Sequence, residues 1–241
     1  MSWTIRKIED NSPQDNSKEI KRLNDALRKA HKSGALLFCA APDEGLLTGT
    51  TFKSYYPVGS EEVSNYIFKI GAATASNTTW EQTGKDEHLD FILPGHEVKE
   101  KDDDLIDLKK DSPKTGSSVA TALAAGLAAL IIHCVRLGAI ETEHFKKHGA
   151  WDKQIVPELP AQTITLEALK NIKTARAMKQ AFHKIPRSQE GDRQKYVEVD
   201  NTFEMPGKAL TNKNTSKDDK WRQVSMLARD IPPPLTYYPR S

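Results

Sequence analysis

The sequence has few cysteines, little net charge and few long apolar segments, and each shortage excludes a class of protein. Its two cysteines, Cys39 and Cys134, lie in apolar segments, which predicts reduced core thiols and excludes a disulfide framework. The 35 basic and 33 acidic residues give a net charge of +2, so the chain lacks the electrostatic footprint of a nucleic-acid-binding protein. The N-terminal residues include no apolar signal segment, and the longest apolar run, within residues 114–136, is too short and too rich in Ala and Gly to predict a membrane span. We therefore expect a cytoplasmic protein with neither a nucleic-acid nor a membrane partner.

What the chain does contain begins with a helix followed by a buried strand, which is half of a βαβ unit. Asn16 and Glu19 have the spacing of a capping box, and apolar residues then recur at helical spacing up to a terminating glycine. Residues 35–41 form an apolar run typical of a strand that is buried on both faces of a parallel sheet. Residues 66–72 and 89–93 are two further strand candidates. The pattern predicts an α/β fold, with a parallel sheet covered by helices on both faces.

The strongest functional signal comes from residues 114–136. This segment opens with a Gly-Ser-Ser turn and continues in Ala, Leu, Gly and Ile, which predicts a helix buried on every face. Ser117 and Ser118 lie at the helix start, where backbone N–H groups are unpaired and the helix dipole is positive. A serine there is most often an N-cap, but its hydroxyl can also lie beside donors that stabilise an oxyanion. The segment alone leaves both interpretations open.

Four motifs in order resemble the catalytic domain of subtilisin-like serine peptidases, the subtilase family, in its C-terminal half. Residues 40–45, Ala-Ala-Pro-Asp-Glu-Gly, resemble the family's Ala-Ala-Gly-Asn-Glu-Gly segment. Residues 69–73 resemble its Val-Gly-Ala strand, residues 90–95 its Asp…Ala-Pro-Gly segment, and residues 116–121 its Gly-Thr-Ser-Met-Ala-Thr nucleophile turn. Residues 1–3 also resemble the Ser-Leu-Gly strand that borders the substrate groove. Similar spacings in the same order make the combination more specific than any one motif.

The resemblance implies a subtilisin-like α/β fold of which only the C-terminal portion is present. It further implies a hydrolase, a serine endopeptidase that cleaves polypeptides through an acyl-enzyme, without a metal or other cofactor. Ser118 occupies the nucleophile position, and Asp43 stands where most of the family has the oxyanion-hole asparagine. Ser2, Trp3 and Ala41 fall at substrate-binding positions. A carboxylate at position 43 cannot donate the hydrogen bond that an amide gives to an oxyanion.

The resemblance also implies that part of the active site lies outside this chain. The family's Asp and His precede the serine in the chain order, ahead of the strand at residues 1–3. No histidine here has the family's His-Gly-Thr context, and His133 lies about four helical turns beyond Ser118, too far for a hydrogen bond. We therefore expect the chain alone to be nearly inactive, with Asp and His supplied by an N-terminal portion or a second chain. The alternative hypothesis is a non-catalytic domain of this fold that serves in protein binding or regulation.

Three regions are predicted along the chain. Residues 1–140 form the subtilase-like portion. Residues 141–203 form a helical extension that packs on it, with a long amphipathic helix capped by Thr165 and a short edge strand near residues 196–199. Residues 204–241 are rich in Lys, Asp, Asn, Thr and Pro, and we expect them to be a disordered tail.

Overall fold

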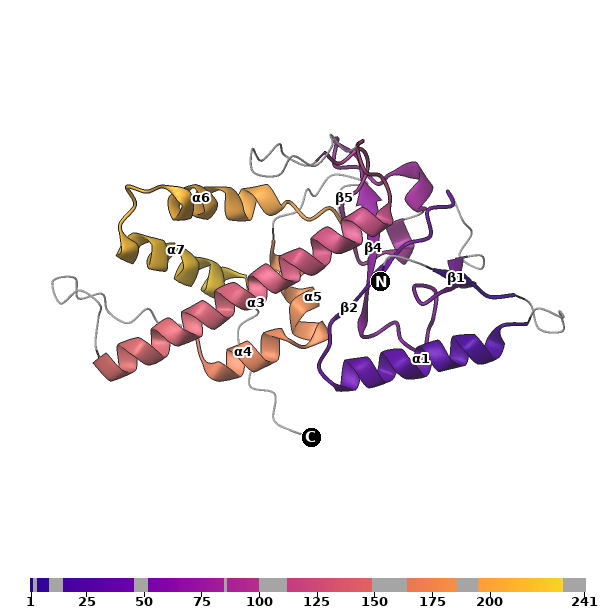
Figure 1. Ribbon diagram of the computed structural model, residues 1–241, viewed down its shortest axis with the longest axis horizontal. Coiled ribbons are helices and arrows are strands. Elements are labelled where there is room, and N and C mark those ends of the chain that lie inside the picture. Colours follow the sequence, from indigo (N-terminus) through magenta and orange to yellow (C-terminus); the bar gives the residue numbers. More distant parts are fainter. Residues whose placement is uncertain are drawn as a thin grey trace. The chain divides into compact units, whose positions relative to one another are not determined.

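The computed structural model describes residues 1, 4–8, 15–45, 52–84, 86–99, 112–148, 164–185 and 195–231. The chain divides into two compact units. The first comprises Met1–Gly126 and Arg187–Val197, and the second Leu127–Pro186 and Glu198–Ser241. The long helix α3, Ser117–His148, begins in the first unit and continues into the second (Figure 1).

The first unit is built on a three-stranded parallel sheet with the strand order β2-β4-β5. Its strands are β2, Leu37–Ala40; β4, Ile67–Ala73; and β5, Phe91–Pro94. Most residues of these strands are buried, as continuous apolar runs without alternation require. On the central strand, the ring of Phe68 is stacked between Phe38 at 4.4 Å and Phe91 at 6.5 Å. The predicted α/β fold with a parallel sheet is confirmed.

Helix α1, Ser17–Lys32, packs on this sheet. Leu27 of the helix belongs to the same buried cluster as Cys39 of β2 and Ile67 of β4. Both cysteines of the chain are buried and free, as expected, and burial raises the pKa of the Cys134 thiol. The cysteines therefore serve as small apolar core residues.

The capping box expected at the start of α1 is not formed. Asn16 does precede the helix, but its side chain makes no hydrogen bond to the first turn. Its Oδ1 instead accepts a hydrogen bond from the backbone of Ile8 at 3.1 Å, and its Nδ2 donates to the carbonyl of Arg6 at 3.0 Å. Asn16 thus ties α1 to strand β1, Ile5–Arg6, which pairs antiparallel with β3, Tyr55–Tyr56.

Both edges of the parallel sheet carry short additions. At the β2 edge, the Met1 amine donates to the carbonyl of Phe38, and the backbone of Ala40 donates to the Met1 carbonyl at 3.0 Å, in the pattern of parallel strands. At the β5 edge, Tyr196 forms a parallel bridge with Ile92. The edge strand expected near residues 196–199 is therefore present as a single bridge.

The predicted burial of α3 on every face is wrong. Ala120 and Ala124 are fully buried, whereas Leu123 is 43% and Leu130 is 42% exposed. Alanine is the commonest residue of this helix, and it is the best helix former whether it faces a core or water. A helix rich in alanine can therefore have an exposed face although its composition is apolar throughout.

α3 is also longer than the sequence indicates. Its part Ser117–His144 is long enough to cross a membrane and contains an 18-residue window with a mean hydropathy of 2.1, of which 44% is buried inside the protein. The expectation that this segment is too short for a span therefore does not hold for the helix itself. The same length and composition also occur in core helices of soluble proteins, so they do not by themselves indicate a membrane.

The second unit consists of helices in its described part. After α3 come four helices: α4, Leu166–Ile172; α5, Ala175–Lys184; α6, Val199–Thr211; and α7, Lys217–Asp230. Thr165 caps α4 as predicted, because its side chain accepts a hydrogen bond from the backbone of Ala168 at 3.1 Å. The single amphipathic helix expected from there is interrupted at Thr174, whose side chain caps α5 in the same way.

Helices α6 and α7 lie where the sequence predicts a disordered tail, so that expectation is wrong for residues 204–230. Ser216 caps α7 by accepting a hydrogen bond from the backbone of Asp219 at 3.0 Å. Val224, Leu227, Ala228 and Ile231 are buried, and their spacing is that of one helix face. Four apolar residues at helical spacing were enough to order a segment whose composition is polar. Residues 232–241 lie outside the described residues.

A half-buried carboxylate, Glu141, is expected to make the stability of the second unit depend on pH. Glu141 accepts a hydrogen bond from the hydroxyl of Ser225, and burial raises its pKa, an effect that Arg229 opposes. A raised carboxyl pKa means that the folded state binds the proton more tightly, so the charged form costs stability above that pKa. Glu141→Gln is therefore expected to raise the free energy of unfolding at about pH 7, by less than about 1 kcal/mol because the group is half-exposed.

Calorimetry at two pH values checks this prediction. The gain in stability should disappear at about pH 3, where the carboxyl is protonated in both folded and unfolded states. A gain of the same size at both pH values would contradict an origin in the charge.

Candidate active site

The start of α3 is held by the loop that follows β2. Oδ2 of Asp43 accepts a hydrogen bond from the backbone N–H of Ser117 at 2.8 Å, and Oδ1 accepts one from the Ser117 hydroxyl at 2.6 Å. Ser117 is fully buried, and its hydroxyl also lies 3.1 Å from Oγ1 of Thr83. The carboxylate therefore caps α3 from a distant part of the chain, by satisfying an N–H that the helix itself leaves unpaired.

Ser118 lies beside the same turn and is partly exposed. A Cβ added to Gly116 would lie 3.1 Å from Oδ2 of Asp43 and 3.3 Å from Oγ of Ser118, so both oxygens border the same small space. Gly116 has a φ of 140°, which side-chain-bearing residues rarely adopt. The structure thus brings Asp43 and Ser118 together at one turn.

Strand β5 fixes the position of this turn. The backbone N–H of Gly116 donates to the carbonyl of Gly95 at 2.7 Å. A Cβ on Gly95 would lie 2.6 Å from Cβ of Ala72 and 3.0 Å from the carbonyl oxygen of Gly116, so these backbones meet only because residue 95 is glycine. Val98 and Lys114 then form a two-hydrogen-bond bridge that closes the connection into the helix.

The chemistry that this turn can perform depends on its donors and acceptors. Ser118 is the second residue of α3, so its backbone N–H has no acceptor inside the helix and can face an oxyanion. Asp43 supplies only acceptors, and both of its oxygens already bind Ser117. The site therefore has a hydroxyl and one oxyanion donor, and a carboxylate where a second donor would be useful.

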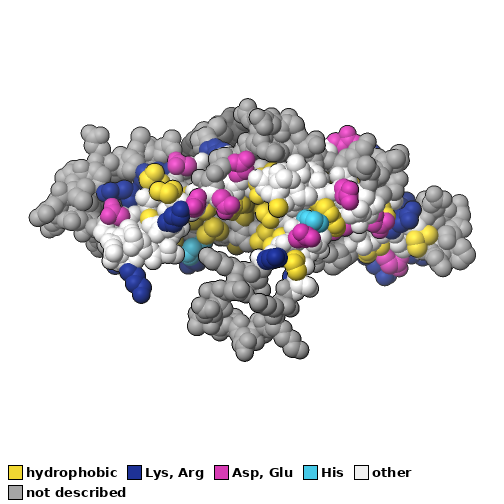
Figure 2. All heavy atoms as spheres, turned by 90° about the horizontal axis from the view of Figure 1, so that it is seen from above, with side chains coloured by type: hydrophobic (Ala, Val, Ile, Leu, Met, Phe, Trp, Pro, Cys, Tyr) yellow, Lys and Arg dark blue, Asp and Glu magenta, His cyan; other side chains and the backbone are white. Residues whose placement is uncertain are grey.

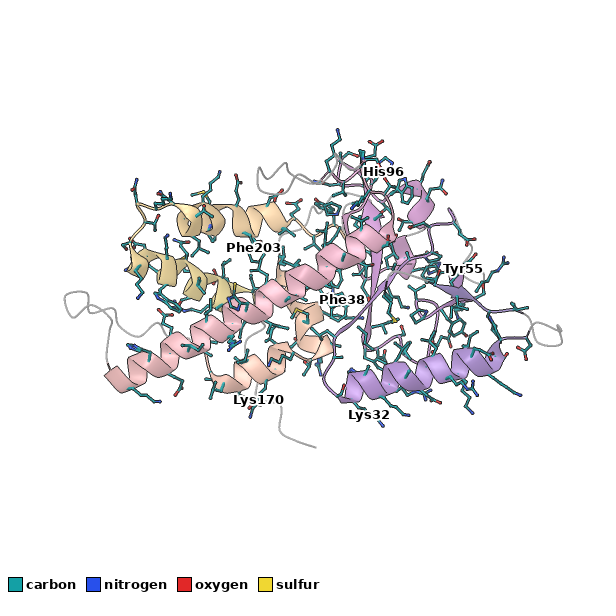
Figure 3. All side chains as sticks on the ribbon, viewed as in Figure 1. Lys32, Phe38, Tyr55, His96, Lys170 and Phe203 are labelled. Carbon is teal, nitrogen blue, oxygen red and sulfur yellow. The ribbon has the colours of Figure 1, made fainter. Side chains whose placement is uncertain are left out.

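The described residues bring no histidine into hydrogen-bonding contact with Ser118. His96 follows Gly95 at this end of the sheet, and its ring lies 5.5 Å from that of Trp80 (Figure 3). His88 stacks on Phe52 at 4.7 Å, and His31 stacks on Tyr66 at 4.4 Å. In the part of the chain that the structure describes, the base needed to activate a serine is therefore not in place.

Of the three residues predicted to bind substrate, the structure describes only Ala41. Ala41 is 4% exposed, and its side chain belongs to a buried cluster with Ala73, Leu89 and Ile92. Its backbone N–H donates to the carbonyl of Ile70, which joins β2 to β4. Ser2 and Trp3 lie outside the described residues.

Sequence reasoning missed one residue of the turn, Thr83, and the contact of Ser117 with Asp43. Thr83 holds the turn by two contacts, because its hydroxyl accepts from the backbone of Ala72 at 3.1 Å and lies against the Ser117 hydroxyl. Nothing in the local sequence marks Thr83. Ser117 was visible beside the nucleophile position, but its contact with Asp43 joins residues 74 positions apart and no periodicity reveals it.

A polar cavity of about 210 Å³ lies elsewhere in the first unit. Its lining includes Lys69, His88 and Asp90, at the amino ends of β4 and β5, whereas Asp43 and Gly95 follow the carboxyl ends of their strands. Ligands of open parallel sheets bind beyond the carboxyl ends, so this cavity is not part of the candidate site. Among the described residues, no group of His, Cys, Asp and Glu is arranged to hold a metal ion.

Charges of both signs lie on the side of the molecule seen in Figure 2. On the side seen in Figure 2, Lys and Arg side chains alternate with Asp and Glu side chains and with hydrophobic ones. This distribution agrees with the net charge of +2 and offers no single-sign field for a polyanion on that side.

The candidate site lies within the part of the chain that is similar to known proteins. A model of the subtilase family matches residues 1–148, a range that includes the Asp43 loop, Gly95 and the start of α3. The major intracellular serine protease of Bacillus subtilis (strain 168) is 25% identical over 154 residues, which cover 64% of this chain and 44% of that protein. The chain therefore spans less than half the length of this relative.

Proposed function

Because this chain belongs to the subtilase family, we propose that its first unit is the nucleophile-bearing part of a serine endopeptidase domain. The observation that carries the proposal is the turn at the start of α3. There Ser118 lies at the positive end of a long helix, and its hydroxyl borders the same space as the Asp43 carboxylate. The family matched over residues 1–148 supports peptide-bond hydrolysis as the chemistry of this serine.

In the proposed reaction, the Ser118 hydroxyl attacks the carbonyl carbon of a peptide bond while a base removes its proton. The Ser118 backbone N–H, at the start of α3, faces the oxyanion of the tetrahedral intermediate. Collapse of this intermediate releases the amine and leaves an acyl-enzyme, which water then hydrolyses. Ser2, Trp3 and Ala41 are proposed to line the path of the polypeptide substrate. No metal or cofactor is needed for these steps.

The base and its orienting carboxylate are proposed to come from outside this chain, from an N-terminal portion of the domain or from a second chain. Two observations support this. His31, His88 and His96 pack against aromatic rings away from Ser118, and the match covers less than half of the Bacillus relative. The chain alone is then inactive or nearly so. The name of that relative, an intracellular protease, supports a cytoplasmic location for this chain.

One observation favours a second function, that of a non-catalytic domain for protein binding or regulation. Asp43 replaces an amide donor with an acceptor, and both of its oxygens are engaged by Ser117. Loss of one oxyanion donor lowers the rate of a serine peptidase on the order of a hundredfold to a thousandfold, as the subtilisin asparagine shows. A domain that had ceased to catalyse would tolerate this change.

Labelling with a fluorophosphonate probe distinguishes the two functions. In a form of the protein that supplies the His and Asp, the probe is expected to modify Ser118, and Ser118→Ala should abolish the label. Ser117→Ala is the matched control, because it removes the neighbouring hydroxyl and should leave most of the label. The present chain alone should remain unlabelled. Absence of label in every longer form would overturn the peptidase proposal and favour the binding role.

A further inference from the structure

The hydroxyl of Ser117 lies between two oxygen atoms, and its single proton can go to only one of them. It lies 2.6 Å from Oδ1 of Asp43 and 3.1 Å from Oγ1 of Thr83. A carboxylate has no proton to donate, so the Ser117 hydroxyl donates to Asp43. At the other contact the Ser117 oxygen must then accept, and the hydroxyl of Thr83 is the donor. The geometry therefore gives this contact a direction.

The hydroxyl of Thr83 is bound in turn by the central strand of the sheet. Its oxygen accepts a hydrogen bond from the backbone N–H of Ala72, on β4, at 3.1 Å. Three hydrogen bonds, which we call the Thr83 network, therefore run in one direction from the backbone of β4 through two hydroxyls to the Asp43 carboxylate. Thr83 is 1% exposed and Ser117 is fully buried, so water does not compete with these bonds. Successive hydrogen bonds of this kind polarise one another, and the one to the charged group is the strongest.

The backbone on either side of the Thr83 network holds Thr83 in place. Thr83 ends a short 3-10 helix, and the residue before this helix, Trp80, donates its N–H to the carbonyl of Ala72 at 2.9 Å. Within the helix, the carbonyl of Gln82 accepts the N–H of Gly45, in the loop after β2, at 2.8 Å. The segment thus binds β4 and the loop after β2 at once. The Thr83 hydroxyl is therefore fixed relative to the strand and to the loop that carries the carboxylate.

We propose that Thr83 is a positioning residue of the candidate active site, which acts through Ser117 to hold the Asp43 carboxylate in one orientation. The inference rests on the proposed role of Ser118 as the nucleophile. Oδ2 of Asp43 borders the same small space as the Ser118 hydroxyl. A carboxylate that turned away from Ser117 would move its negative charge within that space, where the oxyanion forms. The Thr83 network opposes this movement.

Two substitutions distinguish the hydroxyl of Thr83 from its methyl group. Thr83→Val removes the hydroxyl and keeps a β-branched side chain of nearly the same shape. Thr83→Ser keeps the hydroxyl and removes Cγ2, which lies close to β4, because a Cβ added to Gly71 would be 2.6 Å from it. The proposal predicts that Thr83→Val releases the carboxylate and that Thr83→Ser does not. A role in packing alone predicts the reverse order.

The amide of Ser117 reports the orientation of the carboxylate in the chain as it stands. Its N–H donates to Oδ2 of Asp43 at 2.8 Å, whereas Thr83 contacts the Ser117 side chain. In NMR spectra the proton resonance of this amide should move upfield in Thr83→Val and keep its wild-type position in Thr83→Ser. In urea, Thr83→Val should raise the equilibrium constant for unfolding about tenfold, because the buried N–H of Ala72 loses its acceptor. An unchanged resonance in Thr83→Val, or an equal shift in Thr83→Ser, would overturn the proposal.

Fluorophosphonate labelling tests the consequence for the reaction. In a longer form whose Ser118 is labelled, Thr83→Val should slow the labelling about threefold to tenfold, and Thr83→Ser should keep the rate within about twofold of wild type. The rate changes and the final amount of label does not. A wild-type labelling rate in Thr83→Val would contradict the positioning role. Absence of label in every longer form would instead contradict the peptidase proposal, and the Ser117 amide would still decide whether Thr83 orients Asp43.

Discussion

Replacing Asp43 with alanine is expected to destabilise the protein by about 2 kcal/mol. The carboxylate accepts two hydrogen bonds from Ser117, one from the backbone and one from the hydroxyl. Alanine removes both, leaves the first N–H of α3 unpaired, and leaves the buried Ser117 hydroxyl with Thr83 as its remaining contact. An unsatisfied buried donor costs its full desolvation energy, so the effect exceeds that of an ordinary surface substitution.

Urea unfolding measures the loss, and a matched substitution controls for it. Asp230→Ala removes an exposed carboxylate from the last residue of α7, where negative charge is unfavourable, and should leave stability unchanged or slightly higher. Combining Asp43→Ala with Ser117→Ala should cost less than the sum of the two, because they remove the same hydrogen bond. Full additivity would mean that Asp43 acts on α3 through some other contact.

The Asp43→Asn variant distinguishes the role of residue 43 in capping α3 from its role as an oxyanion donor. The amide oxygen can still accept the backbone hydrogen bond of Ser117, so stability should fall by less than in Asp43→Ala. The amide also provides a donor at the position where the subtilase family carries one. In any form of the protein whose Ser118 reacts with a fluorophosphonate, Asp43→Asn is therefore expected to raise the labelling rate on the order of a hundredfold. An unchanged rate would mean that residue 43 does not face the oxyanion.

The sequence predicts the strands of the sheet better than the environment of the helices. The apolar runs that became β2, β4 and β5 were recognisable because buried parallel strands allow almost no polar residue. The sequence overestimates the burial of α3 because alanine, the commonest residue of the helix, is compatible with both core and surface. The tail helix α7 was missed because the spacing of Val224, Leu227 and Ile231 is obscured by a polar composition.

Asp43 and Ser118 were predictable as members of the site, whereas Thr83 and the hydrogen bonds that hold the turn were not. The motif order placed Asp43 and Ser118 in separate segments, and the structure brings them to one turn. The motifs do not predict that Asp43 binds Ser117, the neighbour of the proposed nucleophile, through both oxygens. That contact depends on where the loops after β2 and β5 lie in space. Their positions are determined by the folded sheet and not by the local sequence.

Gly95→Ala is expected to be about as damaging as the loss of the cap, at about 3 kcal/mol, although it adds a single methyl group. That methyl group would lie 2.6 Å from Cβ of Ala72, 3.0 Å from its Cα and 3.0 Å from the carbonyl oxygen of Gly116. Two of these three neighbours are backbone atoms, which cannot rotate away as a side chain could. Relief therefore requires β5 to move away from β4 or from the turn before α3, and the hydrogen bond from Gly116 to Gly95 lengthens in the second case.

The matched control is Gly207→Ala in α6, where the added methyl group meets nothing within 4 Å. Alanine favours a helix over glycine, so this variant should gain up to about 1 kcal/mol. Urea unfolding measures both variants, and hydrogen exchange of the amides at the start of α3 shows whether the turn has moved. If Gly95→Ala keeps wild-type stability to within about 0.5 kcal/mol, the close approach of β4, β5 and the turn does not hold the nucleophile in place. If stability falls while those amides stay protected, the strain is absorbed within the sheet, and Ser118 should keep its position beside Asp43.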